Sequence, residues 1–170
     1  MDFITLFYRG KLKANGDARH KHDIRLAFSP QLKRYWESIN ILFRTVVSGN
    51  CRQLEEGKRT VSHGGLNLLP LVRVADNRPV QLNVQILQPA KTAVLLSTGG
   101  DIDNRLKTLL DALQMPDENQ ANAVAGTGDR LFCLLENDKV VNQVNITTRQ
   151  LWDVPPESRE VVVVVSVSTG

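Results

Sequence analysis

Alternating apolar and polar positions mark several short segments of the chain as β-strands. The first begins near Phe3 and ends before Gly10, and its residues are mostly β-branched or aromatic. Residues 79–87 alternate cleanly, and residues 92–97 either continue that strand or pair beside it. Three further apolar segments predict strands toward the end of the chain, over 131–135, 140–147 and 161–167.

Two other segments carry apolar side chains at the three-to-four-residue spacing of an amphipathic helix. In the first, Ser29 is the predicted cap and Pro30 the first helical residue, and the stripe continues to about Val47. In the second, within residues 99–116, one apolar stripe runs through Ile102, Leu106, Leu109, Leu110 and Leu113. We predict one helix over each segment.

Three of the segments between these elements are polar and have no apolar face. Those near 10–25 and 48–65 are basic and contain glycine, which predicts exposed basic loops, and residues 114–130 predict a mobile loop. The elements then follow in the order strand, helix, several strands, helix and several strands. This order predicts a single α+β domain over residues 1–170, in which two principal helices pack on a mainly antiparallel or mixed sheet in two layers.

Composition narrows the class of protein. The chain has 170 residues, 42% of them hydrophobic, which suits one compact core. No unbroken apolar run exceeds the five residues of Val161–Val165, so we expect no membrane-spanning helix and no membrane partner. No export signal is visible at the N-terminus. Two distant cysteines, Cys51 and Cys133, fit inert, reduced thiols, and we expect a cytoplasmic location.

The charge is divided unevenly along the chain. Residues 1–90 hold 14 Lys and Arg against 7 Asp and Glu, whereas residues 91–170 hold 7 against 11. A basic half is expected of a surface that meets a polyanion, although solvated surface cations would give the same count. The candidate contacts to a nucleic-acid backbone are Arg9, Lys11, Lys13, Arg19, Lys21, Arg25 and Arg105.

Acidic side chains gather at the start of the second predicted helix. Asp101 and Asp103 are separated by one residue, and Lys107 follows Asp103 by one helical turn. Two carboxylates so placed can hold Mg²⁺, which takes oxygen ligands, and Lys107 could meet a phosphate oxygen. Aspartate is also a favoured residue at a helix start, so both acids could serve only to cap the helix.

The run D-I-D-N-x-x-K-x-x-x-D-A-L, Asp101 to Leu113, resembles the signature of the RusA family of Holliday-junction resolvases. These are small, Mg²⁺-dependent, homodimeric endonucleases that cut four-way DNA junctions. In that family a pair of aspartates introduces a strand after the helix, and residues 134–141, LLENDKVV, are the best counterpart. The intervening residues 114–130 separate the two acidic elements further than we expect for the family.

The resemblance implies a role for each matching residue. Asp101 and Asp103 match the two metal-binding aspartates, and Lys107 matches the lysine one turn later. Asp138 matches the second aspartate of the later pair. Asn137 stands where the family has the first aspartate, and Glu136 beside it is a substitute candidate ligand.

The resemblance therefore implies a Mg²⁺-dependent endonuclease of RusA-like fold, with Mn²⁺ as a substitute metal. Its expected reaction is hydrolysis of phosphodiesters in branched DNA, at four-way junctions formed in recombination and repair. A homodimer would match the two equivalent cleavage points of a junction. Two other readings stay open. Asn137 is compatible with a nucleic-acid-binding protein of the same fold that has weak or no activity, and helix capping is compatible with a purely structural protein.

Overall fold

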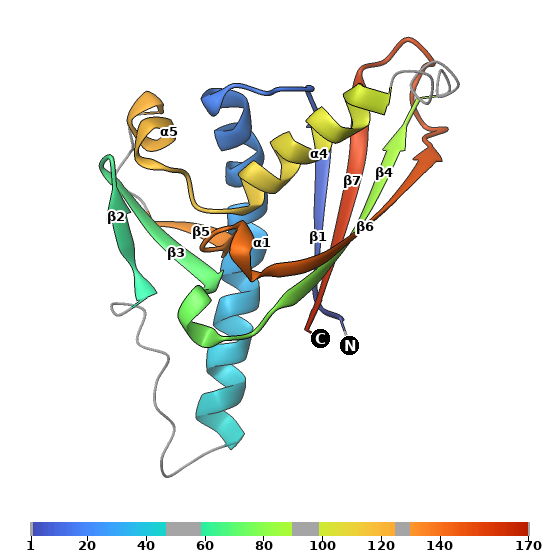
Figure 1. The fold of residues 1–170 in the computed structure, drawn as a ribbon. Coiled ribbons are helices and arrows are strands. Elements are labelled where there is room, and N and C mark those ends of the chain that lie inside the picture. Colours follow the sequence, from blue (N-terminus) through green and yellow to red (C-terminus); the bar gives the residue numbers. More distant parts are fainter. Residues whose placement is uncertain (1, 47–58, 90–98, 125–129, 170) are drawn as a thin grey trace.

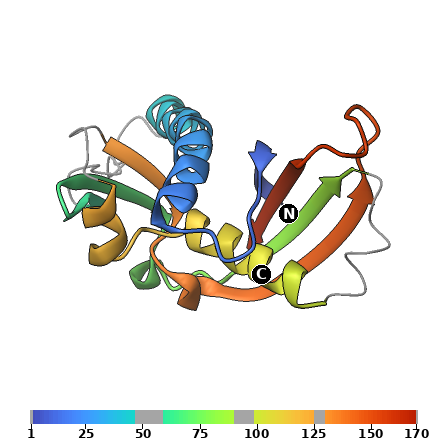
Figure 2. The same ribbon diagram turned by 90° about the horizontal axis from the view of Figure 1, so that it is seen from above.

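Two β-sheets stand on either side of one long helix in a computed structural model of the chain (Figures 1 and 2). The structure describes residues 2–46, 59–89, 99–124 and 130–169. The strands are β1 (Asp2–Lys11), β2 (Val61–His63), β3 (Leu66–Val72), β4 (Val80–Gln88), β5 (Arg130–Leu135), β6 (Val141–Gln150) and β7 (Glu160–Thr169). The helices are α1 (Ala18–Val46), α4 (Gly99–Leu113) and α5 (Glu118–Ala123), with short 3₁₀ turns η1 (Val74–Asp76) and η2 (Asp138–Val140).

Both sheets are mixed. The larger has the order β1-β7-β4-β6, in which only the β4–β6 pair is parallel. The smaller has the order β2-β3-β5, with β3 and β5 parallel. A parallel pair needs a crossover connection, and α4 lies in the one that joins β4 to β6. The predicted α+β class with two principal helices is confirmed.

The division into two sheets was not predicted, because β3 gives no alternating signal. Five of its seven residues are buried, and it contains Pro70. A strand covered on both faces is a continuous apolar run, which the period-two pattern does not detect. The strands β1, β4, β5, β6 and β7 were each predicted to within a few residues, whereas the possible strand over 92–97 lies outside the described residues.

Helix α1 begins at Ala18, twelve residues before the predicted start at Pro30. Its cap is Asp17, whose Oδ1 accepts a hydrogen bond from the backbone N of His20 at 2.8 Å. The predicted basic loop over 10–25 is therefore wrong from residue 18 onward. The first turns of α1 have few apolar residues, so they show no helical stripe. Proline is typical of a helix start, but Pro30 lies inside this helix, at an exposed position. The buried stripe repeats every fourth residue through His20, Ile24, Phe28, Leu32 and Trp36.

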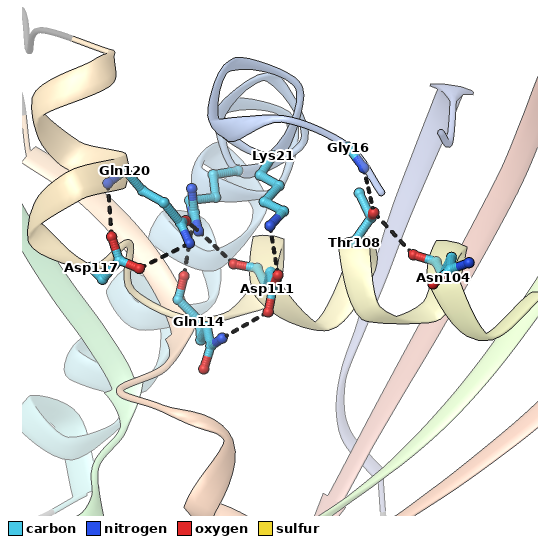
Figure 3. A network of polar contacts seen from close by, with 9 residues as sticks. Gly16, Lys21, Asn104, Thr108, Asp111, Gln114, Asp117 and Gln120 are labelled. Atoms are coloured by element: carbon cyan, nitrogen blue, oxygen red, sulfur yellow. Dashed lines mark hydrogen bonds and ion pairs between the residues drawn. The ribbon is translucent and has the colours of Figure 1, made fainter. Parts of the chain in front are cut away.

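Arg25 joins α1 to the end of α4 and to α5. Its side chain is only 2% exposed. Its Nε donates to the carbonyl oxygen of Gln114 at 3.0 Å, and its Nη2 donates to the carbonyl oxygen of Asp111 and to Oε1 of Gln120 at 2.8 Å. Lys21 adds an ion pair from its Nζ to Oδ2 of Asp111 at 2.7 Å (Figure 3). The expected contact of Arg25 with nucleic acid is wrong, because this guanidinium is committed to the interior.

The predicted mobile loop over 114–130 is partly helical. Asp117 caps α5 by accepting from the backbone N of Gln120 at 2.8 Å. Ala121 is buried in a small core with Leu66, Leu68, Leu131 and Cys133. This core orders the segment through residue 124, and residues 125–129 lie outside the described part.

The last part of the predicted basic loop over 48–65 is a β-strand and a turn. Residues 61–63 form β2, which turns into β3 through Gly64 and Gly65, both with positive φ. Residues 47–58, with Cys51, lie outside the described part. Cys133 is buried, and burial raises the pKa of its thiol to about 12, which keeps it protonated and unreactive. None of the helices in the described residues is long and apolar enough to cross a membrane.

Replacing Arg25 with Met is expected to lower the free energy of unfolding by at least about 3 kcal/mol. Two carbonyl oxygens would each lose a charged donor, and such hydrogen bonds contribute about 1.5–3 kcal/mol apiece. Urea denaturation of the variant and of wild type measures the difference. Arg19→Met is the matched control, because Arg19 is exposed on the same helix and should change stability by less than about 0.5 kcal/mol. Equal losses in both variants would contradict the role given to Arg25.

Stability is also expected to fall between pH 7.5 and pH 5.5. Burial, and then Lys13, lower the pKa of His20, and burial, and then Arg25, lower that of His22. The unfolded chain therefore takes up protons first, so the stability is present above about pH 6.5 and is lost as the pH falls toward the folded pKa values. Protonation would also remove the acceptor Nε2 of His20, which receives the backbone N–H of Lys13 at 3.2 Å.

Thermal unfolding at several pH values measures this effect. The variant His20→Gln offers an amide oxygen as acceptor and does not titrate, so it should retain more of its stability at pH 5.5 than wild type does. An identical pH dependence in the two proteins would show that His20 does not contribute to it.

Candidate functional site

A cavity lies where the ends of three strands of the larger sheet meet helix α4. Its volume is about 400 Å³. The polar residues among those lining it are Lys11, Lys13, Gln88, Arg105, Ser158 and Arg159. None of the lining residues that the structure describes is acidic. The cavity therefore gathers four cations from β1, the segment after it, α4 and the residue before β7.

The segment that carries Lys13 is fixed at both ends. The backbone N of Lys13 donates to Nε2 of His20, and the backbone N of Gly16 donates to Oγ1 of Thr108 at 2.9 Å. The same hydroxyl donates to the carbonyl oxygen of Asn104 at 3.1 Å (Figure 3). A Cβ on Gly16 would lie 2.7 Å from both His20 Cδ2 and Thr108 Cγ2, so the close approach requires glycine. The backbone of Lys13 is thus held to α1, and the segment that follows it is held to α4, which carries Arg105.

Gln88 supplies a buried amide to the cavity. It ends the inward face of β4, which is apolar at Val80, Leu82, Val84 and Ile86. Gln88 is 4% exposed, and its side-chain Nε2 has no hydrogen-bond partner among the residues that the structure describes. Burial of an amide donor without a partner is unfavourable, and such groups often receive water or a ligand.

Arg159 is the cation that sequence reasoning missed. It follows Ser158, whose Oγ accepts from the backbone N of Glu160 at 3.1 Å. Strand pairing places Glu160 opposite Lys11, which brings Arg159 to the same end of the sheet as the predicted cations. About 150 residues separate Arg159 from Lys11 in the sequence. No local pattern indicates this proximity, which follows from the β1–β7 pairing.

The other six predicted nucleic-acid contacts, apart from Arg25, have different surroundings. Lys11, Lys13 and Arg105 all line the cavity. Arg9 instead forms ion pairs with Glu160 and with Asp153, the latter at 2.9 Å, and hydrogen bonds to these two carboxylates raise its pKa. The remaining two lie on α1, where Lys21 pairs with Asp111 and Arg19 is exposed.

The first acidic element lies on the N-terminal half of α4. Asp103 and Lys107 are both exposed and are one turn apart, on one side of the helix. Asp101 belongs to the first turns of the same helix, and its side chain lies outside the described residues. Asp111, the next acid of the motif, has a structural contact, the ion pair with Lys21.

The second acidic element is engaged in local structure. Oε2 of Glu136 accepts from the backbone N of Val74 at 2.7 Å. Oδ1 of Asn137 accepts from the backbone N of Lys139 at 2.9 Å and so caps the turn η2. Asp138 is exposed within that turn.

This second element lies at the far end of α4 from Asp103. Gln114, just past the helix, forms a β-bridge with Leu135, and the backbone N of Met115 donates to the Leu135 carbonyl oxygen at 3.0 Å. Asp103 precedes this contact by about ten residues, or about 15 Å along the helix axis at 1.5 Å per residue. The structure therefore does not bring Asp138 to Asp103.

No group of three or more His, Cys, Asp or Glu side chains able to hold a metal is found among the described residues. This statement does not cover the side chain of Asp101, which lies outside the described part of the structure. A metal held by Asp101 and Asp103 remains a prediction, and the three-carboxylate set with Asp138 receives no support from the geometry.

The chain was compared with protein-family models, with curated proteins and with solved structures, and it matches none of them.

Proposed function

We propose that this protein is a Mg²⁺-dependent, structure-selective endonuclease that cuts branched DNA such as a four-way junction. One observation carries the nucleic-acid part of the proposal: Lys11 and Lys13 line one cavity together with Arg105, which is distant from them in sequence and lies on the helix that bears Asp103. The cleavage part rests on the resemblance of Asp101–Leu113 to the RusA family.

The electrostatics of this face suit a phosphodiester backbone. Cations gathered in a concave site strengthen the local positive potential and favour association with a polyanion. Each phosphate that they neutralise releases condensed counterions, so binding would weaken as salt rises. Lys107, exposed one turn from Asp103, is available to a phosphate oxygen or to charge that develops during cleavage.

The donor chemistry of the first acidic element suits Mg²⁺, which binds through one or two carboxylates and keeps several waters. The proposal assigns the metal to Asp101 and Asp103. Glu136 and Asp138 are left out of this assignment because they lie with the other end of α4. When bound at such a site, Mg²⁺ supplies an activated water and stabilises charge on the scissile phosphate. A homodimer belongs to the proposal, since a four-way junction presents two equivalent cleavage points.

A second candidate is a nucleic-acid-binding protein that does not cut. The contacts of Glu136 and Asn137 favour it, because both side chains are engaged in hydrogen bonds within the fold. In that case the cavity cations would bind DNA, and the aspartates of α4 would serve the helix start.

The proposal predicts metal-dependent, paired nicks near the crossover of a labelled four-way junction, and little cutting of a linear duplex of the same sequence. Chelator should abolish the nicks, and Mn²⁺ should replace Mg²⁺. Asp103→Asn should lower the rate about 100-fold or more, the scale on which loss of a catalytic group acts. Asp23→Asn on α1 is the matched control, and Asp138→Asn should also cut normally. Unchanged cutting by Asp103→Asn would overturn the proposed mechanism.

The binding-only candidate predicts junction binding that weakens between 50 and 200 mM salt, a range over which phosphate contacts typically lose affinity by about three orders of magnitude or more. It predicts no cutting with any metal, even in Asn137→Asp. Aspartate can accept the same capping hydrogen bond as Asn137, so this variant should fold normally. Fluorescence anisotropy and the cleavage assay on one protein preparation measure both properties. Metal-dependent cutting by Asn137→Asp would reject this candidate in its strict form.

A further inference from the structure

We propose that the cavity is a binding site for a phosphoryl group, in which Gln88 donates a hydrogen bond and Lys11, Lys13, Arg105 and Arg159 supply positive charge. The inference deepens the proposed function, and its use on DNA rests on that function. Binding of phosphate itself depends only on the cavity.

The charge of the lining selects an anion. Four cations contribute to the lining, whose remaining surface is mostly apolar, and no acidic residue is among the described lining residues. The cation that lies nearest in sequence but outside the lining, Arg9, has its own carboxylate partners in Asp153 and Glu160. Those two acids are therefore engaged by Arg9.

Gln88 indicates a ligand that accepts hydrogen bonds. Its amide is buried, lines the cavity and lacks a partner among the described residues. An apolar residue would continue the inward face of β4, as it does at Ile86 two positions earlier. An oxygen-rich anion satisfies both the unpaired amide and the surrounding cations, and phosphate offers several acceptor oxygens together with the charge.

The size of the cavity indicates that the phosphoryl group belongs to a larger molecule. A volume of about 400 Å³ far exceeds the roughly 30 Å³ that one water occupies in the liquid. The space beside the anion could hold the attached sugar. The ends of β1, β4 and β7 and helix α4 frame it, so the cations are largely placed before the ligand arrives.

The first experiment follows the melting temperature in inorganic phosphate and in chloride at equal ionic strength. A ligand that binds only the folded state should raise the melting temperature of wild type by about 3–6 °C at about ten times its dissociation constant. The absence of any difference between the two salts would overturn the proposal.

Gln88→Leu gives a two-sided test. It removes the unpaired amide, so it should melt above wild type in chloride, yet it should lose most of the rise in phosphate. Gln85→Leu is the matched control, because Gln85 is exposed on the opposite face of the same strand and should keep the phosphate response. A full phosphate response in Gln88→Leu would contradict the assigned donor.

Arg159→Ala tests the charge at an exposed position where folding is not at risk. It should reduce the phosphate response, whereas Lys139→Ala should not. Lys139 lies before β6, whose start pairs with the beginning of β4, at the other end of that strand from Gln88. Equal responses in both arginine and lysine variants would show that the effect is general screening, and the proposal would be wrong.

Oligonucleotides then distinguish a terminal phosphate from a backbone phosphate. Binding can be followed by the fluorescence of Trp152. This side chain is 82% exposed, and it lies next to Leu151, whose backbone N donates to the carbonyl oxygen of Gln88 at 2.7 Å. The other tryptophan, Trp36, is buried. Preference for a 5′-phosphorylated single strand over its unphosphorylated form would identify a terminal group, and equal binding that is lost in Gln88→Leu would identify the backbone.

These measurements separate the two proposals. Asp103→Asn should keep the phosphate response, because Asp103 is not part of the cavity lining. A protein that binds phosphate but never cuts DNA would retain the site and reject the nuclease. A protein that cuts DNA but shows no phosphate response would retain the nuclease and reject the site.

Discussion

The buried guanidinium of Arg25 donates hydrogen bonds to two carbonyl oxygens at the C-terminal end of helix α4, those of Asp111 and Gln114. Arg25 reaches them from α1 and also binds the side chain of Gln120 on α5, so one cation joins three helices that come from different parts of the chain. Helix ends leave carbonyl oxygens without partners, and a cation there also opposes the negative end of the helix dipole. This contact fixes the C-terminal end of α4, and a second contact along the helix is needed to set the direction that places Asp103 and Arg105.

Helix α4 is also held further along its length, at Thr108, by the segment that joins β1 to α1. Thr108 and His20 hold the backbone of this segment at Gly16 and Lys13, and the glycine leaves no room for a side chain between them. Helix α4 is therefore tied to the same N-terminal region at its C-terminal end and again at Thr108. The cavity opens beside this second attachment, where strands β4 and β7 also end. Its cations are held by secondary structure or by short, hydrogen-bonded connections.

The acidic residues are placed less closely together than the cations are. A nuclease site that uses both acidic elements would need Asp103 and Asp138 to meet, whereas the β-bridge between Gln114 and Leu135 keeps the second element at the far end of α4. Glu136 accepts a hydrogen bond from the backbone of Val74 and Asn137 caps η2, so both side chains are engaged in contacts that stabilise the fold. The proposed function consequently depends on the first element, and on cations that the fold gathers in a cavity beside the same helix.

The sequence by itself determined the elements whose residues repeat at a regular spacing. The alternation in β1, β4 and β7 and the leucine stripe of α4 reflect local geometry, and each was predicted from a short window. The motif on α4 and the basic character of the N-terminal half were visible in the same way. The sequence predicts helix α1 only from Pro30 onward. Its earlier turns are missed because His20 and Arg25 occupy buried positions where the helical pattern expects apolar residues. Only the tertiary structure decided which cations share a site. Pairing of β1 with β7 brings Arg159 to Lys11, and the end of β4 adds Gln88, since strand pairing depends on segments far apart in the chain and leaves no local trace.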